Sequence, residues 1–280
     1  MPELPEVTTI INVLKNTTLI NNKIKSVDVL IPKVIQNASI QKFKNFFINE
    51  KIINIERLGK YIIYKLTNKK VFVSHLRMEG KFFYGETNNL KDLPHLMVLF
   101  NFTNGNSLAY CDSRMFGTFS IYHEDDYLKS KELSKVSIDP LDKKFTAEFL
   151  FNKIQNINRP IKTVLLDQTI VSGIGNIYAD EILFMCKVHP LTKAKKITKK
   201  ECELICKYSK KILLDAIKHK GTTIFSYKFD RNHSGEYQQF LNIHQRENKP
   251  CKICKTPIVK IKVNGRGTYF CPKCQKERQC

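Results

Sequence analysis

The spacing of hydrophobic residues changes twice along the chain, and these changes decide the fold class. From about residue 23 to residue 122, short apolar and β-branched runs are bounded by turn residues, which is typical of β-strands. The predicted strands lie at 24–30, 52–58, 61–66, 71–76, 96–102, 107–111 and 118–122. The segment Asn104-Gly105-Asn106 supplies a hairpin turn between two of them. Seven short strands of this kind predict a β-sandwich-like domain.

Helical spacing is found on both sides of this β-rich region. Before it, Val7, Ile10, Ile11 and Leu14 recur at the interval of one helix face, so residues 3–18 are predicted to form an amphipathic helix. After it, helices are predicted at 146–154, 161–166, 176–185 and 199–219. Residues 221–245 are polar and lack a clear period, so a loop is predicted there.

These patterns predict a multidomain protein of the α+β class. Residues 1–133 are expected to form a β-sandwich domain with a leading helix, followed by a charged hinge at 134–146. A helical domain is expected at 147–245, and a small cysteine-bearing module at 246–280. A chain of 280 residues is long enough for such an arrangement.

The charge of the chain favours a polyanionic partner. Lys and Arg number 47 against 26 Asp and Glu, which gives a formal net charge of +21. Such an excess favours nucleic acid through phosphate contacts and counterion release. Compositional drift is an alternative reading, because AT-rich coding inflates Lys, Asn and Ile together. The sequence contains no apolar run near the roughly 18 residues of a membrane span, and its acidic start is unlike a secretory signal. We therefore expect a soluble, cytoplasmic protein without a membrane partner.

Four of the nine cysteines form two C-x-x-C pairs near the end of the chain. The spacing Cys251-x2-Cys254-x16-Cys271-x2-Cys274 fits a four-thiolate zinc site. Four thiolates leave no open position for water, so one structural Zn²⁺ is predicted rather than a catalytic one. A redox dithiol is the alternative, although a single C-x-x-C would suffice for that. The other cysteines follow no pattern, which suits a reducing compartment.

The cysteine module is itself basic. From residue 251 on, the sequence has eight basic residues and one acidic residue, Glu277. Arg266 lies between Gly265 and Gly267 at the expected tip of a hairpin, where a phosphate can approach closely. A solvated surface arginine is the alternative reading.

Seven sequence blocks lie along the whole chain and are Met1-Pro2-Glu3-Leu4-Pro5-Glu6-Val7, Gly59-Lys60-Tyr61, His75-Leu76-Arg77-Met78-Glu79-Gly80, Asp112-Ser113-Arg114-Met115-Phe116-Gly117, Gly173-Ile174-Gly175-Asn176-Ile177-Tyr178-Ala179-Asp180-Glu181, Gly221-Thr222-Thr223 and Gly267-Thr268-Tyr269-Phe270-Cys271-Pro272. Together, and in this order, they resemble one known family, the formamidopyrimidine-DNA glycosylases. The resemblance implies an N-terminal β-sandwich, a helix–two-turn–helix domain and a zinc finger. It also implies that the protein acts, as a monomer, on duplex DNA containing oxidised purines, removing the base and cleaving the strand by β,δ-elimination.

The resemblance assigns the chemistry to the first residues. It implies that Pro2, freed by removal of Met1, is the Schiff-base nucleophile, with Glu3 as proton donor and Glu6 in support. An α-amine has a reference pKa of about 7.7–8.0 against about 10.4 for lysine, so it is far more often neutral near pH 7. Without the resemblance, Pro2 and Glu3 would simply start a helix, with the carboxylate near its positive end.

The resemblance also assigns DNA contacts. Lys60 and Arg266 are expected to contact phosphate and to donate protons in the β- and δ-elimination steps. His95, Lys162 and Asn176 are expected to bind DNA, with Asn176 also able to cap a helix. A base inside a stack cannot be reached, so the damaged nucleotide must be flipped out. The residues expected to enter the duplex in its place are Met78, Arg114 and Phe116.

Two departures from the family pattern leave alternatives open. Met115 replaces a residue that is commonly basic, and the loop 231–237, which would cover the flipped base, does not follow the usual pattern. No base-recognition residue is therefore assigned in that loop. The alternatives are a related glycosylase for oxidised pyrimidines and a non-catalytic zinc protein that binds DNA.

Overall fold

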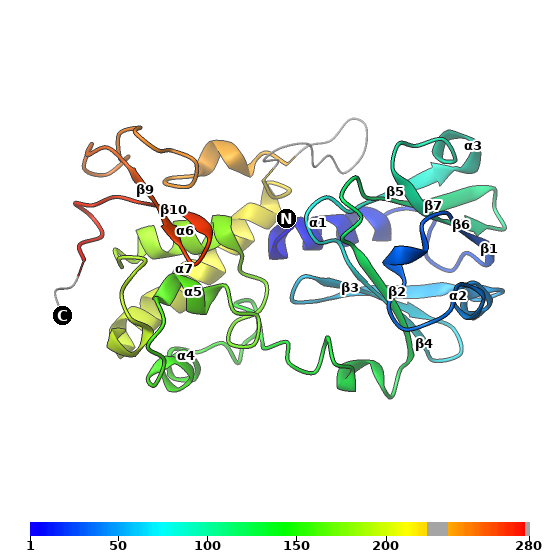
Figure 1. Cartoon of the computed structure of the whole chain (residues 1–280), viewed down its shortest axis with the longest axis horizontal. Helices are drawn as coiled ribbons and strands as arrows, with labels where there is room; N and C mark the ends of the chain where they lie inside the picture. The colour runs from blue at the N-terminus through cyan, green and yellow to red at the C-terminus, as the bar shows by residue number, and fades with distance from the viewer. Residues whose placement is uncertain (223–234, 278–280) are drawn as a thin grey trace. The chain divides into compact units, whose positions relative to one another are not determined.

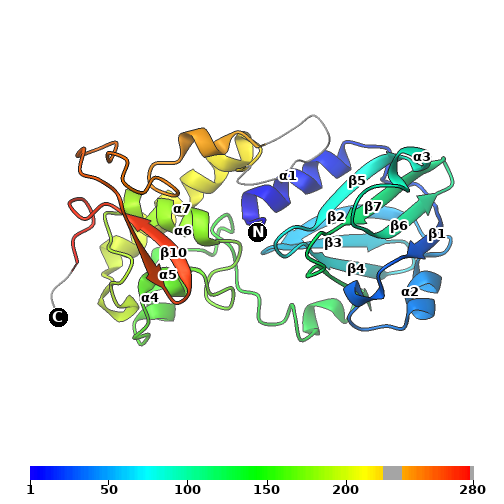
Figure 2. The same ribbon diagram turned by 45° about the horizontal axis from the view of Figure 1, so that its top comes forward.

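The computed structural model describes residues 1–222 and 235–277, and the chain divides into two compact units. The first consists of Met1–Ser134 with Lys220–Glu236, and the second of Lys135–His219 with Tyr237–Cys280. Each unit is described below by itself (Figures 1 and 2).

The first unit is a sandwich of two antiparallel four-stranded sheets, drawn face to face in Figure 2. One sheet has the order β1 (Ile24–Val29), β6 (Leu96–Phe102), β7 (Asn106–Cys111), β5 (Lys81–Glu86). The other has the order β2 (Ile52–Leu58), β3 (Tyr61–Leu66), β4 (Lys70–His75), β8 (Thr118–His123). The predicted β-sandwich is confirmed, with a strand at each predicted place. Short helical segments connect the strands: η1 (Pro32–Val34), α3 (Thr87–Leu90) and η2 (Tyr127–Lys129).

Besides these short segments, strand β5 and helix α2 were not predicted from the sequence. Strand β5 has only Phe82 fully buried and lies at the edge of its sheet, so it lacks the clear alternation of a half-buried strand. Helix α2 (Ile40–Phe47) begins after Ser39, whose Oγ accepts a hydrogen bond from the Lys42 N–H at 3.3 Å. Its buried residues Phe43 and Phe47 are one helical turn apart.

The core of the sandwich is rich in aromatic rings from both sheets. Phe47 of α2 has its ring centroid 5.4 Å from that of Phe72 in β4 and 5.1 Å from that of Phe100 in β6. Phe119 of β8 lies 4.8 Å from Phe72, edge to face. These four side chains are at most 2% exposed, so each fills the space between the sheets and joins them by dispersion and apolar burial.

The leading helix, α1 (Leu4–Lys15), packs on β2 and β3. Val7, Ile10, Ile11 and Leu14 are at most 5% exposed, which confirms the predicted apolar face. The N-cap residue is Glu3, which forms a capping box with Glu6.

The second unit is helical, as predicted, with a small hairpin. Its helices are α4 (Ala147–Ile154), α5 (Ile161–Leu165), α6 (Asn176–Met185) and α7 (Lys199–Lys218), with 3-10 turns η3 (Ala194–Lys196) and η4 (Tyr237–Phe240). Both α4 and α6 pack on α7, which Thr198 and Glu201 begin with a capping box. The hairpin of β9 (Val259–Val263) and β10 (Arg266–Phe270) contacts α6 through β10 (Figure 1). Across the described ranges, no helix has both the length and the apolar composition needed to cross a bilayer.

Candidate functional site

The start of the chain holds two buried carboxylates in one hydrogen-bonded arrangement. Met1 is 44% exposed, whereas Pro2 is buried. Glu3 and Glu6 are each only 3% exposed. The Glu3 N–H donates to Glu6 Oε2 at 2.9 Å. The predicted supporting residue Glu6 therefore orients the backbone that carries Glu3 and Pro2.

The other oxygen of Glu6 binds a segment that is distant in sequence. Glu6 Oε1 accepts hydrogen bonds from the N–H of Thr222 at 2.8 Å and from its hydroxyl at 3.2 Å. The preceding Gly221 has φ +76°, and a Cβ placed there would lie 2.6 Å from Glu6 Oε1. Glycine is required here for its left-handed backbone and for the close approach of the carboxylate. Of the predicted loop at 231–237, residues 231–234 lie outside the described residues, and only residues 235–237 are described.

Lys60 lies in the turn between β2 and β3 and is 5% exposed. Most lysines are exposed to solvent, so the burial of Lys60 is unusual for this residue type. Its neighbourhood includes His75, a residue that sequence reasoning had not singled out. Burial, with the charges of Arg77 and Lys60, lowers the pKa of His75 to about 3. His75 Nδ1 accepts the Arg77 N–H at 3.0 Å, as expected for a neutral ring.

The three residues predicted to enter the duplex lie on two loops that meet at one buried tyrosine. Met78 is half-buried in the loop between β4 and β5, while Phe116, 48% exposed, follows β7. The Arg114 guanidinium lies over the Phe116 ring, 4.9 Å from its centroid. Glycines Gly80 and Gly117 both pack on the Tyr110 hydroxyl so closely that a Cβ at either would collide with it. The structure thus brings these predicted residues onto adjacent loops.

Asp112 organises the loop that carries Arg114 and Phe116. Its side chain, in a residue only 1% exposed, accepts N–H bonds from Arg114 at 3.0 Å, Phe116 at 3.0 Å and Gly117 at 2.8 Å. The Asp112 N–H in turn donates to the carbonyl of His95 at 3.0 Å. The predicted DNA contact His95 is exposed and has φ +59°. One buried carboxylate therefore fixes the backbone below two exposed side chains.

In the second unit, Asn176 and the hairpin tip are joined directly. Asn176 is the first residue of α6, after the N-cap residue Gly175, so it does not cap the helix as the sequence suggested. Its Nδ2 donates to the Gly267 carbonyl at 3.0 Å. Arg266 is exposed at the start of β10, directly after the Asn264-Gly265 turn.

The structure places Lys162, a predicted DNA contact, inside the second unit. Its side chain is 0% exposed and forms a 2.7 Å ion pair with Asp180. The same ammonium donates to the Gly267 carbonyl at 3.1 Å and to Thr268 Oγ1 at 2.8 Å. The Lys162 ammonium is therefore held by protein groups inside the second unit, and a DNA contact by Lys162 stays a prediction. Sequence could not show this burial, because it depends on partners far along the chain.

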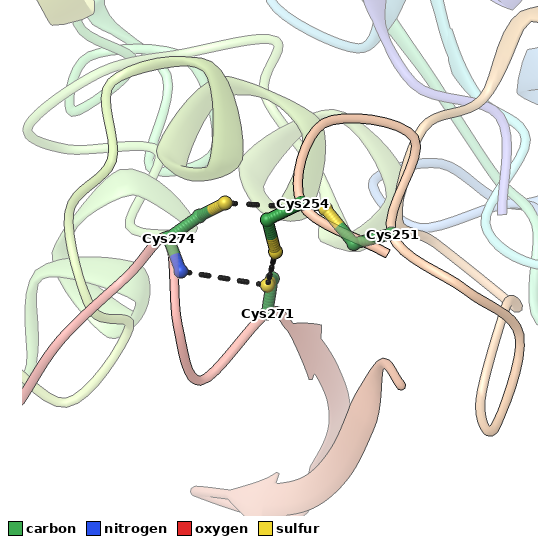
Figure 3. Close-up of side chains that lie close together, drawn as sticks. All are labelled: Cys251, Cys254, Cys271 and Cys274. Atoms are coloured by element: carbon green, nitrogen blue, oxygen red, sulfur yellow. Dashed lines mark hydrogen bonds between the residues drawn. The ribbon is translucent and has the colours of Figure 1, made fainter. Parts of the chain in front are cut away.

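The four paired cysteines lie together, as Figure 3 shows. Their sulfur atoms all lie within 4.8 Å of one another, with Cys251 and Cys271 buried. Backbone N–H groups of Ile253 and Cys274 donate to the sulfurs of Cys251 and Cys271, each at 3.4 Å. Hydrogen bonds from Thr256 lower the pKa of Cys254 to about 6, which favours the thiolate that binds metal. A closed set of four sulfurs fits a structural Zn²⁺ and leaves no position for a reacting water.

Buried polar residues attach this module to the helices. Gln275 donates to the Val188 carbonyl at 2.9 Å and accepts the Cys271 N–H at 3.0 Å. Glu181 of α6 accepts N–H bonds from Asn242, Ile243 and His244 at 2.9–3.0 Å. Sequence reasoning missed Glu181 and the adjacent Asp180. The available signal was two acidic residues inside an otherwise apolar helix, which predicts buried carboxylates with specific partners.

The remaining described cysteines show no metal-binding arrangement. Burial raises the pKa of the Cys111 thiol to about 11 and, with help from nearby glutamates, that of Cys202 to about 12. Such thiols are protonated and unreactive. Within residues 1–222 and 235–277, no other group of three His, Cys, Asp or Glu side chains is arranged to hold a metal.

A β-sandwich with buried N-terminal carboxylates and a helical unit with a four-cysteine hairpin define a class of multidomain α+β proteins with a structural zinc site, which comparisons with known proteins specify further. A sequence model of the formamidopyrimidine-DNA glycosylase N-terminal domain matches residues 1–119. The H2TH domain of the same family matches residues 136–228, and the zinc finger found in FPG and IleRS matches residues 248–276. The chain belongs to the formamidopyrimidine-DNA glycosylase family.

Relatives extend this similarity over the whole chain. A formamidopyrimidine-DNA glycosylase of Ureaplasma parvum is 50% identical, covering 98% of this chain and 100% of its own. That of Mycoplasma pneumoniae is 46% identical, covering 99% and 100%. Among solved structures, a Lactococcus lactis FPG mutant in complex with DNA containing Fapy-dG has a TM-score of 0.91 at 33% identity, covering 99% and 100%. The complex of Lactococcus lactis Fpg with DNA containing an abasic site has a TM-score of 0.90 at 32% identity, covering 98% and 100%.

Proposed function

We propose that this protein is a base-excision DNA glycosylase with lyase activity, which removes oxidised purines from duplex DNA. The observation that carries the proposal is the buried arrangement of Glu3 and Glu6 at Pro2, in a chain that matches formamidopyrimidine-DNA glycosylases over its whole length. The Zn²⁺ held by the four cysteines has a structural role, because its ligand set is complete without water.

The chemistry begins with the amine of Pro2, after removal of the exposed Met1. A neutral secondary amine attacks C1′ of the sugar, so the C1′–N bond to Pro2 forms and the glycosidic bond breaks with its electron pair on the base, which takes up the proton lost by the Pro2 nitrogen. We assign to Glu3 the donation of a proton to the sugar ring oxygen as the ring opens. The resulting iminium withdraws electrons from C2′, so the Glu3 carboxylate takes the C2′ proton, a C2′–C3′ double bond forms and the C3′–O bond breaks with departure of the 3′-phosphate in β-elimination. We assign Lys60 and Arg266 to the phosphates and to proton donation in the β- and δ-elimination steps.

Access to the base requires that the nucleotide leave the stack. Phe116 is exposed and apolar, so it can enter between base pairs and kink the duplex, while Met78 fills the vacated space. Arg114 is placed beside Phe116 and can donate to the orphaned base, for which we propose cytosine. His95 and Asn176 are assigned to the phosphate backbone, which positions the protein without reading sequence.

A second substrate class is favoured by one relative. A solved structure of wild-type Lactococcus lactis Fpg, 32% identical to this chain with a TM-score of 0.89, holds DNA containing an oxidised pyrimidine. Oxidised pyrimidines therefore belong in any substrate panel for this protein. We place the activity in the cytoplasm, beside the chromosome, because the full-length relatives are bacterial proteins, and we expect a monomer to suffice.

Glu3→Gln tests the proposal with little change in shape. We expect excision of 8-oxoguanine opposite cytosine to slow by at least about 100-fold, the usual range for loss of an acid–base group. Binding of a duplex with a stable abasic-site analogue should stay within about threefold of wild type. Glu86→Gln, at an exposed strand end, is the matched control and should keep full activity. Normal excision by Glu3→Gln would overturn the assigned role. A protein that binds DNA but excises neither purine nor pyrimidine lesions would be the non-catalytic alternative.

A further inference from the structure

A buried network in the second unit joins helix α6, the 242–244 segment and the hairpin tip. We propose that Asp180 and His244 are positioning residues, which fix the backbone at Arg266 and Asn176 for their contacts with phosphate. This inference rests on the proposed function, because it takes the DNA-contact roles of Arg266 and Asn176 from there. Neither Asp180 nor His244 contacts substrate in this proposal.

The centre of the network is the carboxylate of Asp180, in a residue 1% exposed. One oxygen forms the 2.7 Å ion pair with the Lys162 ammonium, and the other lies 2.7 Å from His244 Nδ1. The second oxygen also accepts the Tyr269 N–H at 3.4 Å. Because a carboxylate only accepts, His244 must carry its proton on Nδ1 in this arrangement. His244 and Lys162 thus hold the carboxylate from opposite oxygens and fix its orientation.

From Asp180 the hydrogen bonds lead to the hairpin tip. Lys162 donates to the Gly267 carbonyl and to the Thr268 hydroxyl. The Thr268 hydroxyl then donates to the Arg266 carbonyl at 3.1 Å. Asn176 donates to the same Gly267 carbonyl as Lys162. The backbone on both sides of Gly267 is therefore held from inside the unit, while the Arg266 side chain is exposed.

The physical character of the network favours a role in geometry over one in stability. A buried ion pair often contributes no more to folding than apolar residues of the same volume, because desolvation offsets the attraction. Its hydrogen bonds nevertheless have fixed directions, which an apolar cluster lacks. A displacement of about 1 Å at a positioned group can reduce a reaction rate by about 100-fold. Arg266 lies at the hairpin tip, and its proposed contact with phosphate depends on the position of this backbone.

The test is a double-mutant cycle between His244 and Arg266. His244→Phe removes the Nδ1 donor and keeps a ring beside Tyr269, whose ring centroid lies 5.0 Å away. With an abasic-analogue duplex, fluorescence anisotropy should show binding weakened about tenfold by His244→Phe in the wild-type background. In an Arg266→Ala background, the same substitution should change the dissociation constant by less than about twofold, because there is no guanidinium left to position.

Two further variants separate positioning from general damage. His244→Asn places an amide near the position of Nδ1 and should restore much of the binding, whereas His244→Gln, whose amide mimics Nε2, should not. His189→Phe is the matched control, because His189 is also buried and its ring lies 4.6 Å from Phe270 of the same strand. This control should alter binding by the same factor in both Arg266 backgrounds. Zinc content and thermal unfolding establish that each variant is folded.

The outcomes are distinguishable. Equal weakening by His244→Phe in both backgrounds, or equal behaviour of the Asn and Gln variants, would overturn the positioning role and leave the proposed function intact. Arg266→Ala that binds as tightly as wild type would instead remove Arg266 from the proposed function, and this inference would fail with it.

Discussion

The substitution Asp112→Asn removes the negative charge of a carboxylate that accepts three backbone N–H bonds in the loop carrying Arg114 and Phe116. Asp112 Oδ2 accepts N–H bonds from Phe116 and Gly117, and Oδ1 accepts one from Arg114. An asparagine has one carbonyl oxygen, so its NH₂ group must face at least one of these donors. One charge-assisted hydrogen bond is lost, worth about 1.5–3 kcal/mol, and the two that remain become neutral and weaker. Because Arg114 and Phe116 are exposed, water can replace part of this loss. We expect the free energy of unfolding of the first unit to fall by about 2–4 kcal/mol.

Urea unfolding followed by circular dichroism measures this change, with Asp142→Asn as the control. The Asp142 carboxylate accepts a single N–H, from Lys144 at 2.8 Å on an exposed turn, so its substitution should cost under about 0.5 kcal/mol. In a duplex with 2-aminopurine beside the lesion, Asp112→Asn should also slow the fluorescence rise that reports base flipping. Equal stability of the two variants, or unchanged flipping by Asp112→Asn, would refute the view that this carboxylate holds the loop.

Three other perturbations test separate parts of the structure. Gly221→Ala forces a side chain into left-handed backbone against Glu6, so excision should fall while zinc content stays constant; wild-type excision by this variant would contradict the close packing. His75 has a pKa of about 3 in the folded protein against 6.5 for the free side chain, so the unfolded chain binds one more proton between these values. The stability difference between wild type and His75→Asn should therefore shrink as pH falls below about 6.5, by at most about 1.4 kcal/mol per pH unit, and a constant difference would argue against a neutral buried ring. Removal of Zn²⁺ by a chelator should abolish DNA binding and unfold the hairpin while the near-ultraviolet dichroism of the sandwich persists; retained binding would show that the four thiolates are dispensable.

The sequence predicted the elements whose pattern is set by their own residues. The seven strands were predictable because each is a short apolar and β-branched run bounded by turn residues, and helix α1 because its apolar residues recur at the spacing of one helix face. Strand β5 and helix α2 were not, because each buries only one or two large side chains and depends on neighbouring strands for its conformation. The zinc site was predictable because cysteine spacing alone fixes a ligand set.

The functional residues divide in the same way. The wedge residues, the N-terminal residues and Lys162 were all assigned through resemblance to a family, and the burial of Lys162 was not foreseen because an isolated lysine is expected at the surface. Its burial depends on Asp180, and that ion pair exists only once α5 and α6 pack together. His75 and Asp112 were also missed as individual residues, since nothing local distinguishes a polar side chain that orders a backbone from one that is solvated.

The central claim is that the Pro2 amine forms a covalent bond with damaged DNA. The most direct measurement is borohydride trapping of the zinc-loaded protein on a duplex with 8-oxoguanine opposite cytosine, followed by peptide mapping of the cross-link. We predict a trapped complex whose modified peptide begins at Pro2, and no trapped complex from protein that retains Met1 or an N-terminal extension. A cross-link that maps to a lysine, or no cross-link from protein shown by intact mass to have lost Met1, would contradict the account.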